Sequence, residues 1–292
     1  MSNYTGAANR VGGSYKARLV GKKTLIYIVC VFLCVLSIFP FLVMFVNATR
    51  PSADIAQRLS LIPGNMLSTN IKTLNERQNF DVLRGMWNSM LVSTSATCLC
   101  LYVSLMTSYG LTVYRFKGNK LAFTFIMVIL MIPSQVSIIG FFNEMYKMGL
   151  INTFWPLIVP AAASPSVVFF MRQYMQSGLP LEIVEAARID GCGEFRTFNR
   201  IALPMMTPAI ATQAIFTFVG SWNNLFTPSM VINSQAKFTM PMLVSLLKSD
   251  RFRTDFGTVY LALSLTVLPL FVVYFALSKF IIGGVALGGV KE

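Results

Sequence analysis

The sequence is poor in ionisable residues. Among its 292 residues there is no histidine and there are only 11 Asp and Glu, while charged residues make up 12% and hydrophobic residues 55% of the chain. No cluster of nucleophile, general base or metal ligands can be assembled from so few polar groups. An integral-membrane enzyme is therefore the least favoured class, and we expect no catalytic residue, no metal site and no cofactor.

A nucleotide-binding loop is also missing. The pattern G-x-x-x-x-G-K-[ST], whose backbone cradles phosphates, does not occur, and the nearest fragment, G-K-K-T at residues 21–24, lacks its spacing and residue order. The chain cannot be its own ATPase, so an ATP-driven pump would need a partner to supply the energy.

The five cysteines form no recognisable framework. On a helix, Cys98 and Cys100 point to different sides, while Cys30 and Cys34 share a face but are better explained as soft apolar fillers than as metal ligands. No disulfide framework is predicted.

Long apolar stretches dominate the chain, whose mean hydropathy is +0.64. A bilayer span needs about 20 apolar residues. Six stretches meet that requirement, at 24–46, 88–111, 121–142, 153–171, 202–230 and 259–277, and none contains Asp, Glu, Lys, Arg or His. Because a charge at bilayer depth is costly, the sequence predicts an all-α integral membrane protein with six transmembrane helices.

Basic residues set the predicted orientation. The tail at 1–23 carries five basic residues and no acid, and the short second loop, around Arg115 and Lys120, is also basic without an acid. Both are therefore expected to be cytoplasmic, which with six spans places both termini and the fourth loop on that side. The tail is predicted to be disordered. The net charge of +13 is spread over every loop, so it indicates attraction to membrane lipid and no nucleic-acid partner.

The most informative stretch is short and polar: residues 185–204 read E-A-A-R-I-D-G-C-G-E-F-R-T-F-N-R-I-A-L-P. Pro180 suits the start of a helix, which we expect over 181–190. Gly191 then supplies a stop, because glycine tolerates the left-handed conformation that ends helices. A second helix is expected over 193–201, leading into the next apolar segment.

The first of these helices is predicted to carry a docking surface. Ala186 and Ala187 leave a low profile that another protein can approach closely, and Glu185 and Arg188, three residues apart, form a charged edge beside it. The pattern resembles the signature loop of the inner-membrane subunits of binding-protein-dependent ABC importers. The positions that carry the resemblance are Glu185, Ala186, Ala187, Gly191, Ile201, Leu203 and Pro204.

The resemblance extends over about residues 87–292 and narrows to the carbohydrate-uptake permeases, the maltose-type family. It is carried by N-S-M-L-V-S from Asn88, S-Y-G-L-T-V-Y-R-F-K-G at 108–118, S-W-N-N at 221–224 and the Gly-rich end of the chain. Many relatives have an acid in place of Asn224. The first span fits the family only by its position.

This resemblance implies a type-1 ABC importer transmembrane fold with a cytoplasmic coupling helix in the cell membrane. The expected parts are a basic tail (1–23), a first span (24–46), an extracytoplasmic loop with short helices (47–87), a core (88–280) containing the coupling loop (180–204), and a Gly-rich cytoplasmic tail (281–292). The implied partners are a second, similar permease subunit, two copies of an ATPase subunit and an extracytoplasmic solute-binding protein.

Particular residues receive roles on this basis. Coupling to the ATPase is expected of Glu185, Ala186, Ala187, Arg188, Asp190, Gly191, Ile201, Leu203 and Pro204, with a further ATPase contact at Gly288 and Lys291. The candidates for the pathway and its gate are Pro133, Gln135, Pro208, Gln213, Trp222 and Asn223. Proline kinks are tolerated where neighbours or a cavity satisfy the freed backbone groups, although simple packing kinks are an equal alternative.

Polar and aromatic side chains in the spans leave alternatives open. The polar residues of the third and fifth predicted spans either face a wet cavity or bond between helices; they are Ser134, Gln135, Ser137, Thr207, Thr212, Gln213 and Thr217. A sugar stacking on Phe216, Phe218 or Trp222 is a further hypothesis.

The sequence does not choose the solute. A sugar or oligosaccharide is expected from the resemblance, with a glycerol phosphate ester as the alternative, and whether this subunit contacts the solute stays open. An ion-coupled secondary transporter is disfavoured because its usual ionisable relay is missing from the predicted spans. Only a flux assay with and without ATP hydrolysis would distinguish a passive pore or a scaffold from an ATP-driven transporter.

Overall fold

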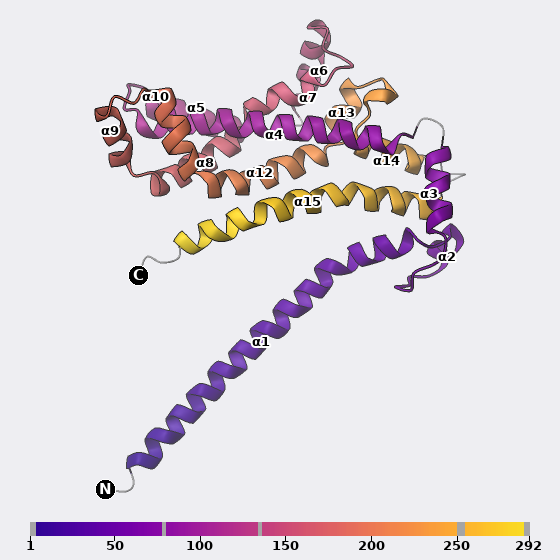
Figure 1. The fold of residues 1–292 in the computed structure, drawn as a ribbon, viewed down its shortest axis with the longest axis horizontal. Helices are drawn as coiled ribbons and strands as arrows, with labels where there is room; N and C mark the ends of the chain where they lie inside the picture. The colour runs from indigo at the N-terminus through magenta and orange to yellow at the C-terminus, as the bar shows by residue number, and fades with distance from the viewer. Residues whose placement is uncertain (1–3, 78–79, 134–135, 250–254, 289–292) are drawn as a thin grey trace. The chain divides into compact units, whose positions relative to one another are not determined.

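The structure is a computed structural model that describes residues 4–77, 80–133, 136–249 and 255–288, and every regular element among them is a helix (Figure 1). The all-α prediction is therefore confirmed for the described residues. Two compact units are present: Met1–Thr73 with Asp255–Ser264, and Leu74–Thr254 with Leu265–Glu292. Below they are called unit 1 and unit 2.

Unit 1 is built from α1 (Tyr4–Asn47), α2 (Ser52–Gln57), most of α3 (Leu67–Glu76) and the beginning of α15 (Phe256–Gly288). The long helix α1 already begins at Tyr4, so the prediction of a disordered tail over residues 1–23 is wrong from that residue onward. The apolar stretch that follows the tail favours a helix, and this helix extends toward the N-terminus through the tail as far as Tyr4. The prediction of short helices after the first span is confirmed by α2 and α3.

Asp255 caps the N-terminus of α15 within unit 1. Its carboxylate accepts hydrogen bonds from the backbone N–H groups of Gly257 (3.1 Å) and Thr258 (3.4 Å), from the Thr258 hydroxyl (2.6 Å) and from the Ser52 hydroxyl. Burial alone would raise the pKa of Asp255, but these hydrogen bonds to the charged form outweigh it and hold the pKa below its ordinary value.

Unit 2 is organised around α4 (Val82–Val113), which packs along α8 (Pro165–Gly178) and α12 (Thr207–Trp222) (Figure 1). Its other elements are α5 (Asn119–Leu130), α6 (Ile138–Lys147), α7 (Trp155–Ile158), η1 (Val159–Ala162), α9 (Leu181–Ile189), α10 (Glu194–Thr197), η2 (Phe198–Ala202), α11 (Leu203–Met205), α13 (Phe226–Val231), η3 (Gln235–Lys237), α14 (Met240–Ser249) and the rest of α15. The buried face of α4 is lined largely by small side chains, which let neighbouring helices approach closely.

Four helices of the described residues are long and apolar enough to cross a membrane: Lys22–Asn47, Val82–Val113, Trp155–Gly178 and Phe256–Phe280. A fifth is obtained if Glu194–Met205 and Thr207–Trp222, which are bent by 78°, count as one span. The prediction of six continuous spanning helices is therefore not matched. The chain is still an apolar, multi-helix protein suited to a bilayer.

The third predicted span, 121–142, is not one helix. The described helix α5 ends at Leu130 and α6 begins at Ile138. With 12 residues, α5 is about 18 Å long, which is short of the roughly 30 Å hydrocarbon core. Pro133 explains the break, because a proline lacks the N–H of the helical ladder and its ring clashes with the carbonyl four residues earlier.

The fourth predicted span differs in another way, because its last helix ends later than the sequence predicts. The helix α8 continues beyond Met171 to Gly178, so Arg172 belongs to a helix that is apolar enough to span. Its guanidinium lies 4.0 Å from the centre of the Phe123 ring, and its buried Nε has no hydrogen-bond partner among the described residues. A cation over an aromatic face is partly compensated electrostatically, so the charge is tolerated there.

Candidate functional site

The polar hairpin, defined here as residues 180–204, begins with α9. Gly191 follows this helix with a φ of 75°. Its N–H donates to the carbonyl of Arg188 (3.0 Å), and the N–H of Cys192 donates to the carbonyl of Ala187 (2.9 Å). This pair of bonds is the Schellman motif, which satisfies carbonyls at a helix end. The predicted helix and its glycine stop are confirmed.

The second arm of the polar hairpin consists of α10, a π-helical turn η2 and α11. Met206 follows, fully buried, at the 78° bend into α12. The Thr207 hydroxyl donates to the carbonyl of Pro204 (2.6 Å), which becomes available because Pro208 cannot donate to it. Leu203 and Pro204 therefore join the hairpin directly to the apolar helix, as expected, and Ile201 lies in the π-helical turn.

Buried side chains anchor the polar hairpin to the apolar helices. Val184 of α9 is 1% exposed and Phe198 of η2 is 2% exposed, and both belong to one core cluster with Leu105 of α4 and Met171 of α8. Such close-packed contacts resist deformation. A displacement of α9 would therefore be transmitted to the helices that it packs on.

Ala187 does not lie on the open face of α9. It is 7% exposed within this chain, whereas Ala186 and Glu185 are exposed. The prediction that both alanines present a low surface is therefore wrong for Ala187, because it lies on the same side of the helix as the buried Val184. The surface that a partner can reach is made by the residues beside it.

Arg188 does not complete the expected charged edge with Glu185. Its Nε donates to Oε1 of Glu194 at 2.6 Å and its Nη2 to Oε2 at 3.2 Å, and its guanidinium carbon lies 5.6 Å from the centre of the Tyr114 ring. The Tyr114 hydroxyl donates to the same carboxylate at 2.6 Å. Burial and then this hydrogen bond raise the pKa of Tyr114. Arg188, Glu194 and Tyr114 together connect both arms of the hairpin to the end of α4.

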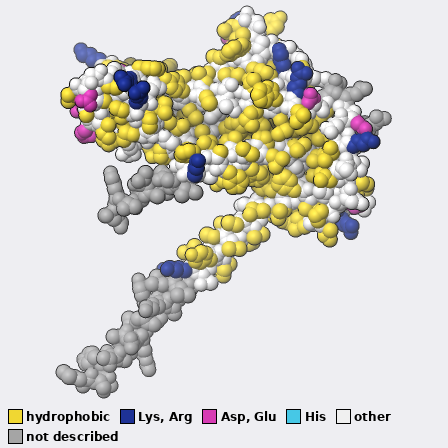
Figure 2. Space-filling view, viewed as in Figure 1, with side chains coloured by type: hydrophobic (Ala, Val, Ile, Leu, Met, Phe, Trp, Pro, Cys, Tyr) yellow, Lys and Arg dark blue, Asp and Glu magenta, His cyan; other side chains and the backbone are white. Residues whose placement is uncertain are grey.

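The open face of the polar hairpin carries two apolar side chains that sequence reasoning missed. Ile189 is 87% exposed and Phe195 is 70% exposed. Figure 2 shows acidic and basic side chains gathered over the end of the molecule that holds α9 and α10. A small cavity of about 330 Å³, lined by Tyr114, Glu185 and others, lies beside α9. Exposed apolar side chains among charges are typical of a protein-binding surface. The signal in the sequence was an isolated Ile and Phe inside a polar stretch.

A larger cavity of about 1010 Å³ lies among the apolar helices of unit 2 and is called the central cavity below. Its polar lining comes from several elements, with Ser93 on α4, Ser137 before α6, Ser164 before α8, Ser221 on α12, and Asn224 and Thr239 in the segments that follow. The described lining contains no Asp, Glu, Lys or Arg. This hollow is uncharged and rich in hydroxyl groups.

The structure distributes the predicted pathway residues unevenly. Pro133, Ser137 and Thr217 line the central cavity. Pro208 and Gln213 are half-buried and Asn223 is exposed at the end of α12. Ser134, Gln135 and Lys291 lie outside the described residues, and Gly288 is the last residue of α15.

Several polar and aromatic candidates have structural partners instead. The indole N–H of Trp222 donates to the carbonyl of Thr266 (3.1 Å), and its ring stacks on Phe218 at 5.6 Å. Both side chains are buried. The Thr212 hydroxyl donates to the carbonyl of Pro208 (2.9 Å), within its own helix. Phe218 and Trp222 therefore pack the interior, and sugar stacking on them is not supported.

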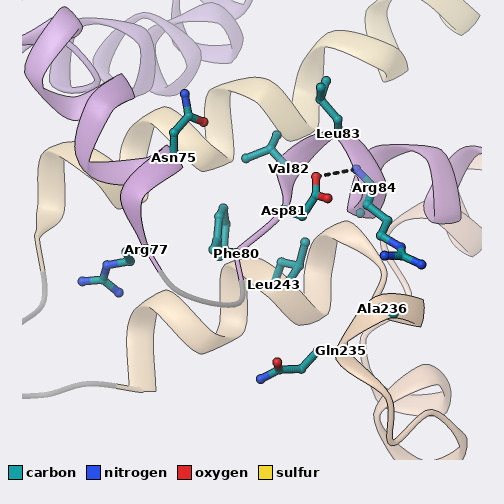
Figure 3. Close-up of a pocket in the computed structure, with 11 residues that line it drawn as sticks. Asn75, Arg77, Phe80, Asp81, Val82, Leu83, Arg84, Gln235, Ala236 and Leu243 are labelled. Atoms are coloured by element: carbon teal, nitrogen blue, oxygen red, sulfur yellow. Dashed lines mark hydrogen bonds between the residues drawn. The ribbon is translucent and has the colours of Figure 1, made fainter.

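A second cavity, of about 520 Å³, lies at the N-terminus of α4 (Figure 3). Figure 3 shows Asp81 directed at the backbone N–H of Arg84, which it accepts at 3.0 Å as the N-cap of the helix. Phe80 and Leu243 also line this cavity. The carboxylate of this lining is thus already engaged in capping a helix.

Comparison with known proteins shows which family the sequence resembles. The family described as binding-protein-dependent transport system inner membrane component matches residues 101–286. The arabinooligosaccharides transport system permease protein AraQ of Halalkalibacterium halodurans is 34% identical over 264 residues, covering 89% of this chain and 93% of the relative. The lactose transport system permease protein LacG of Rhizobium radiobacter is 33% identical, covering 88% and 92%.

The fold is also found among solved structures. One of them is the crystal structure of a bacterial ABC transporter involved in the import of the acidic polysaccharide alginate, with a TM-score of 0.74 and 18% identity, covering 93% of this chain and 97% of that chain.

Proposed function

Because the chain belongs to the family of binding-protein-dependent transport system inner membrane components, we propose that it forms half of the translocation pathway of an ATP-driven importer and receives mechanical work at its polar hairpin. It is a permease subunit and not an enzyme. Membership of this family implies an ATPase and a solute-binding protein as partners.

The observation that carries the proposal is the two-sided construction of α9. One side is buried through Val184 in the core that α4 and α8 share, and the other side presents Glu185, Ala186 and Ile189 to the exterior. A partner that grips the exposed side would move the helix as a rigid lever, and the packed side would pass the motion on. Hinge-type transitions use rigid elements in this way.

The finer assembly is part of the same proposal. A second, similar permease subunit completes the pathway, and two ATPase copies bind at the polar hairpins, with Glu185 pairing a basic residue of the ATPase. The hairpin, both termini and the second loop are cytoplasmic, because the loops richest in uncompensated basic residues are retained on that side. The loop at 47–87 faces the solute-binding protein, and residues near Gly288 reach toward the ATPase.

The proposed solute is a sugar or oligosaccharide. The relatives that support it are named for arabinooligosaccharides and for lactose. A glycerol phosphate ester is the alternative, which a transport assay with both kinds of solute distinguishes.

The test replaces Glu185 by Lys in the complete importer. We expect solute-stimulated ATP hydrolysis and uptake to fall at least tenfold and co-purification of the ATPase to weaken, since reversing one charge of a close interfacial pair costs several kcal/mol. Glu144→Lys is the matched control, because it makes the same charge change on the exposed end of α6. Normal uptake and normal ATPase recovery in Glu185→Lys would exclude the coupling role.

A further inference from the structure

Arg172 is a charged side chain to which the importer function gives no role. It lies in Trp155–Gly178, a stretch that is apolar enough to cross a membrane, where a charge is costly unless it is paired or reaches the membrane surface. Among the described residues it has no hydrogen bond and no ion pair, and its one interaction is with the face of the Phe123 ring. The ring offsets the charge only in part, which leaves the guanidinium available to an anion.

We propose that Arg172 and Lys120 together bind the phosphate of an anionic phospholipid, at a surface called the headgroup site below. The Nε of Arg172 is enclosed, but the side chain as a whole is only half-buried, so the far end of its guanidinium reaches the surface. Lys120 is exposed and precedes Phe123 by three residues, which puts both on one side of α5. Because Arg172 lies over Phe123, the two cations meet at the same edge between α5 and α8.

Apolar side chains beside the headgroup site supply the surface that acyl chains need. Leu121, Phe125 and Val128 are exposed and recur at intervals of four and three residues, so they form one stripe along α5. On α8, the partly exposed Phe169 stacks on Phe123 with the ring centres 6.4 Å apart and extends this surface. A phospholipid has the same arrangement, with a charged headgroup at one end of its apolar chains.

The headgroup site lies near the end of both helices, where lipid phosphates are found. The helix α5 begins directly after the basic second loop, and α8 ends at Gly178, just before the polar hairpin. Figure 1 shows both at the same end of unit 2 as α9 and α10. Arg172 precedes Gly178 by six residues, about 9 Å along a helix, and a long arginine side chain extends its charge toward the membrane surface. Basic pockets between spanning helices on the cytoplasmic side bind anionic headgroups.

Charge selects an anionic lipid over a neutral one. The second loop adds the exposed Arg115 and Lys117, and no Asp or Glu occurs between Tyr114 and Leu130. A phosphatidylcholine headgroup carries its own cation, which these basic residues repel, whereas phosphatidylglycerol has a net negative charge. The selectivity should weaken as salt is added, because exposed charges are screened.

The test measures which lipids remain bound to the protein. The full chain, purified with the partners that accompany it, is placed in nanodiscs of equal amounts of phosphatidylglycerol and phosphatidylcholine, and native mass spectrometry counts the lipids of each kind retained after release. We expect the unaltered protein to retain phosphatidylglycerol preferentially. Arg172→Gln should lower this retention about tenfold, because hydrogen bonds to charged groups are the stronger ones. Lys120→Gln should lower it about threefold, because its charge is exposed.

Lys279→Gln is the matched control. Lys279 also lies near the end of a helix long enough to span, and its Nζ is 5.0 Å from the centre of the Phe280 ring. The variant therefore makes the same charge change beside an aromatic ring, on α15 and outside the headgroup site. Its phosphatidylglycerol retention should equal that of the unaltered protein. An equal loss in all three variants would show that any cation near the membrane has this effect, which overturns a specific site.

The remaining outcomes identify a different occupant or none. Unchanged phosphatidylglycerol retention in both Arg172→Gln and Lys120→Gln would overturn the headgroup site. If Arg172→Gln keeps its lipids but loses an accompanying membrane protein, the guanidinium binds a carboxylate of that protein instead. If excess inorganic phosphate displaces phosphatidylglycerol from the unaltered protein, the site takes free phosphate and not a lipid.

Two features keep this test decisive. Lys120 is exposed and outside the core, so Lys120→Gln still reports on the headgroup site if Arg172→Gln fails to fold. The lipid count is also independent of transport. A failure of the headgroup site therefore leaves the importer function standing, and the Glu185→Lys test can fail without affecting the lipid result.

Discussion

Gly191 ends α9 with a backbone φ of 75°, a conformation in which a side chain bearing a Cβ is strained. A β-branched residue there costs about 1–3 kcal/mol, and it would loosen the two hydrogen bonds to the carbonyls of Ala187 and Arg188. We therefore predict that Gly191→Val makes the amides of α9 exchange hydrogen about five- to a hundredfold faster. Uptake should fall with it.

Gly193 provides the control for this prediction. It has an ordinary extended backbone, with φ of −67° and ψ of 150°, and an added Cβ would meet no atom within 4 Å at either glycine. Gly193→Val should therefore change exchange and uptake little. The same exchange rates in both variants would mean that the left-handed turn does not hold the hairpin together.

Single residues were predictable where the chemistry is local. The stop at Gly191 follows from glycine's freedom at positive φ, and the opposite orientations of Cys98 and Cys100 follow from helical geometry. The Arg188–Glu194 pair was missed because it forms across a turn whose geometry the sequence does not specify. The buried Ser93 hydroxyl, which has no hydrogen-bond partner within the described part of the chain, was equally hidden, because the partners of a polar group are set by neighbours that are distant in the sequence.

At the scale of elements, the hydropathy of the sequence correctly predicted three helices that run without a break through the whole apolar stretch. The predicted spans 88–111 and 259–277 lie inside α4 and α15, and 24–46 lies inside α1. The spans 121–142 and 202–230 were wrong as single helices, because each contains backbone breaks that a measure of apolar content does not register. Pro133 and the segment around Met206 mark those breaks.

The beginning of α15 gives a prediction about pH. The pKa of Asp255 is held below its ordinary value in the folded protein, so its contribution to stability is fully present above the unfolded pKa of about 4 and is lost as pH falls through the folded pKa. Asp255→Asn should lower the thermal unfolding temperature of the purified protein at pH 6. The gap between the two proteins should close as the pH is lowered from about 4 toward 2.

Ser52→Ala should have a smaller effect of the same sign, because it removes one of the hydrogen bonds to the Asp255 carboxylate. A gap between Asp255→Asn and the unaltered protein that stays constant from pH 6 to pH 3 would contradict the cap. That result would mean that the carboxylate is not needed in its charged form.

At the scale of the whole molecule, the transport hypothesis requires the polar hairpin and the 47–87 loop to lie on opposite sides of the membrane. The basic residues of the tail and of the second loop favour a cytoplasmic hairpin, although the 47–87 loop also carries basic residues, which are mixed there with acids. The orientation can be tested with one native and one introduced thiol. Cys192 lies in the hairpin, and Ser68 is exposed on α3.

In a background with the four cysteines of the apolar helices replaced by alanine, we predict that a membrane-impermeant maleimide labels Ser68→Cys in intact cells and labels Cys192 only in inverted vesicles. Unfolding the protein in detergent before labelling supplies the control that both thiols can react. Labelling of both thiols from the same side would contradict an odd number of crossings between them, and labelling of Cys192 in intact cells would place α9 where no ATPase can reach it. Since the buried side of α9 is packed on α4 and α8 whichever way the chain is inserted, only this result decides whether its exposed side faces the energy source.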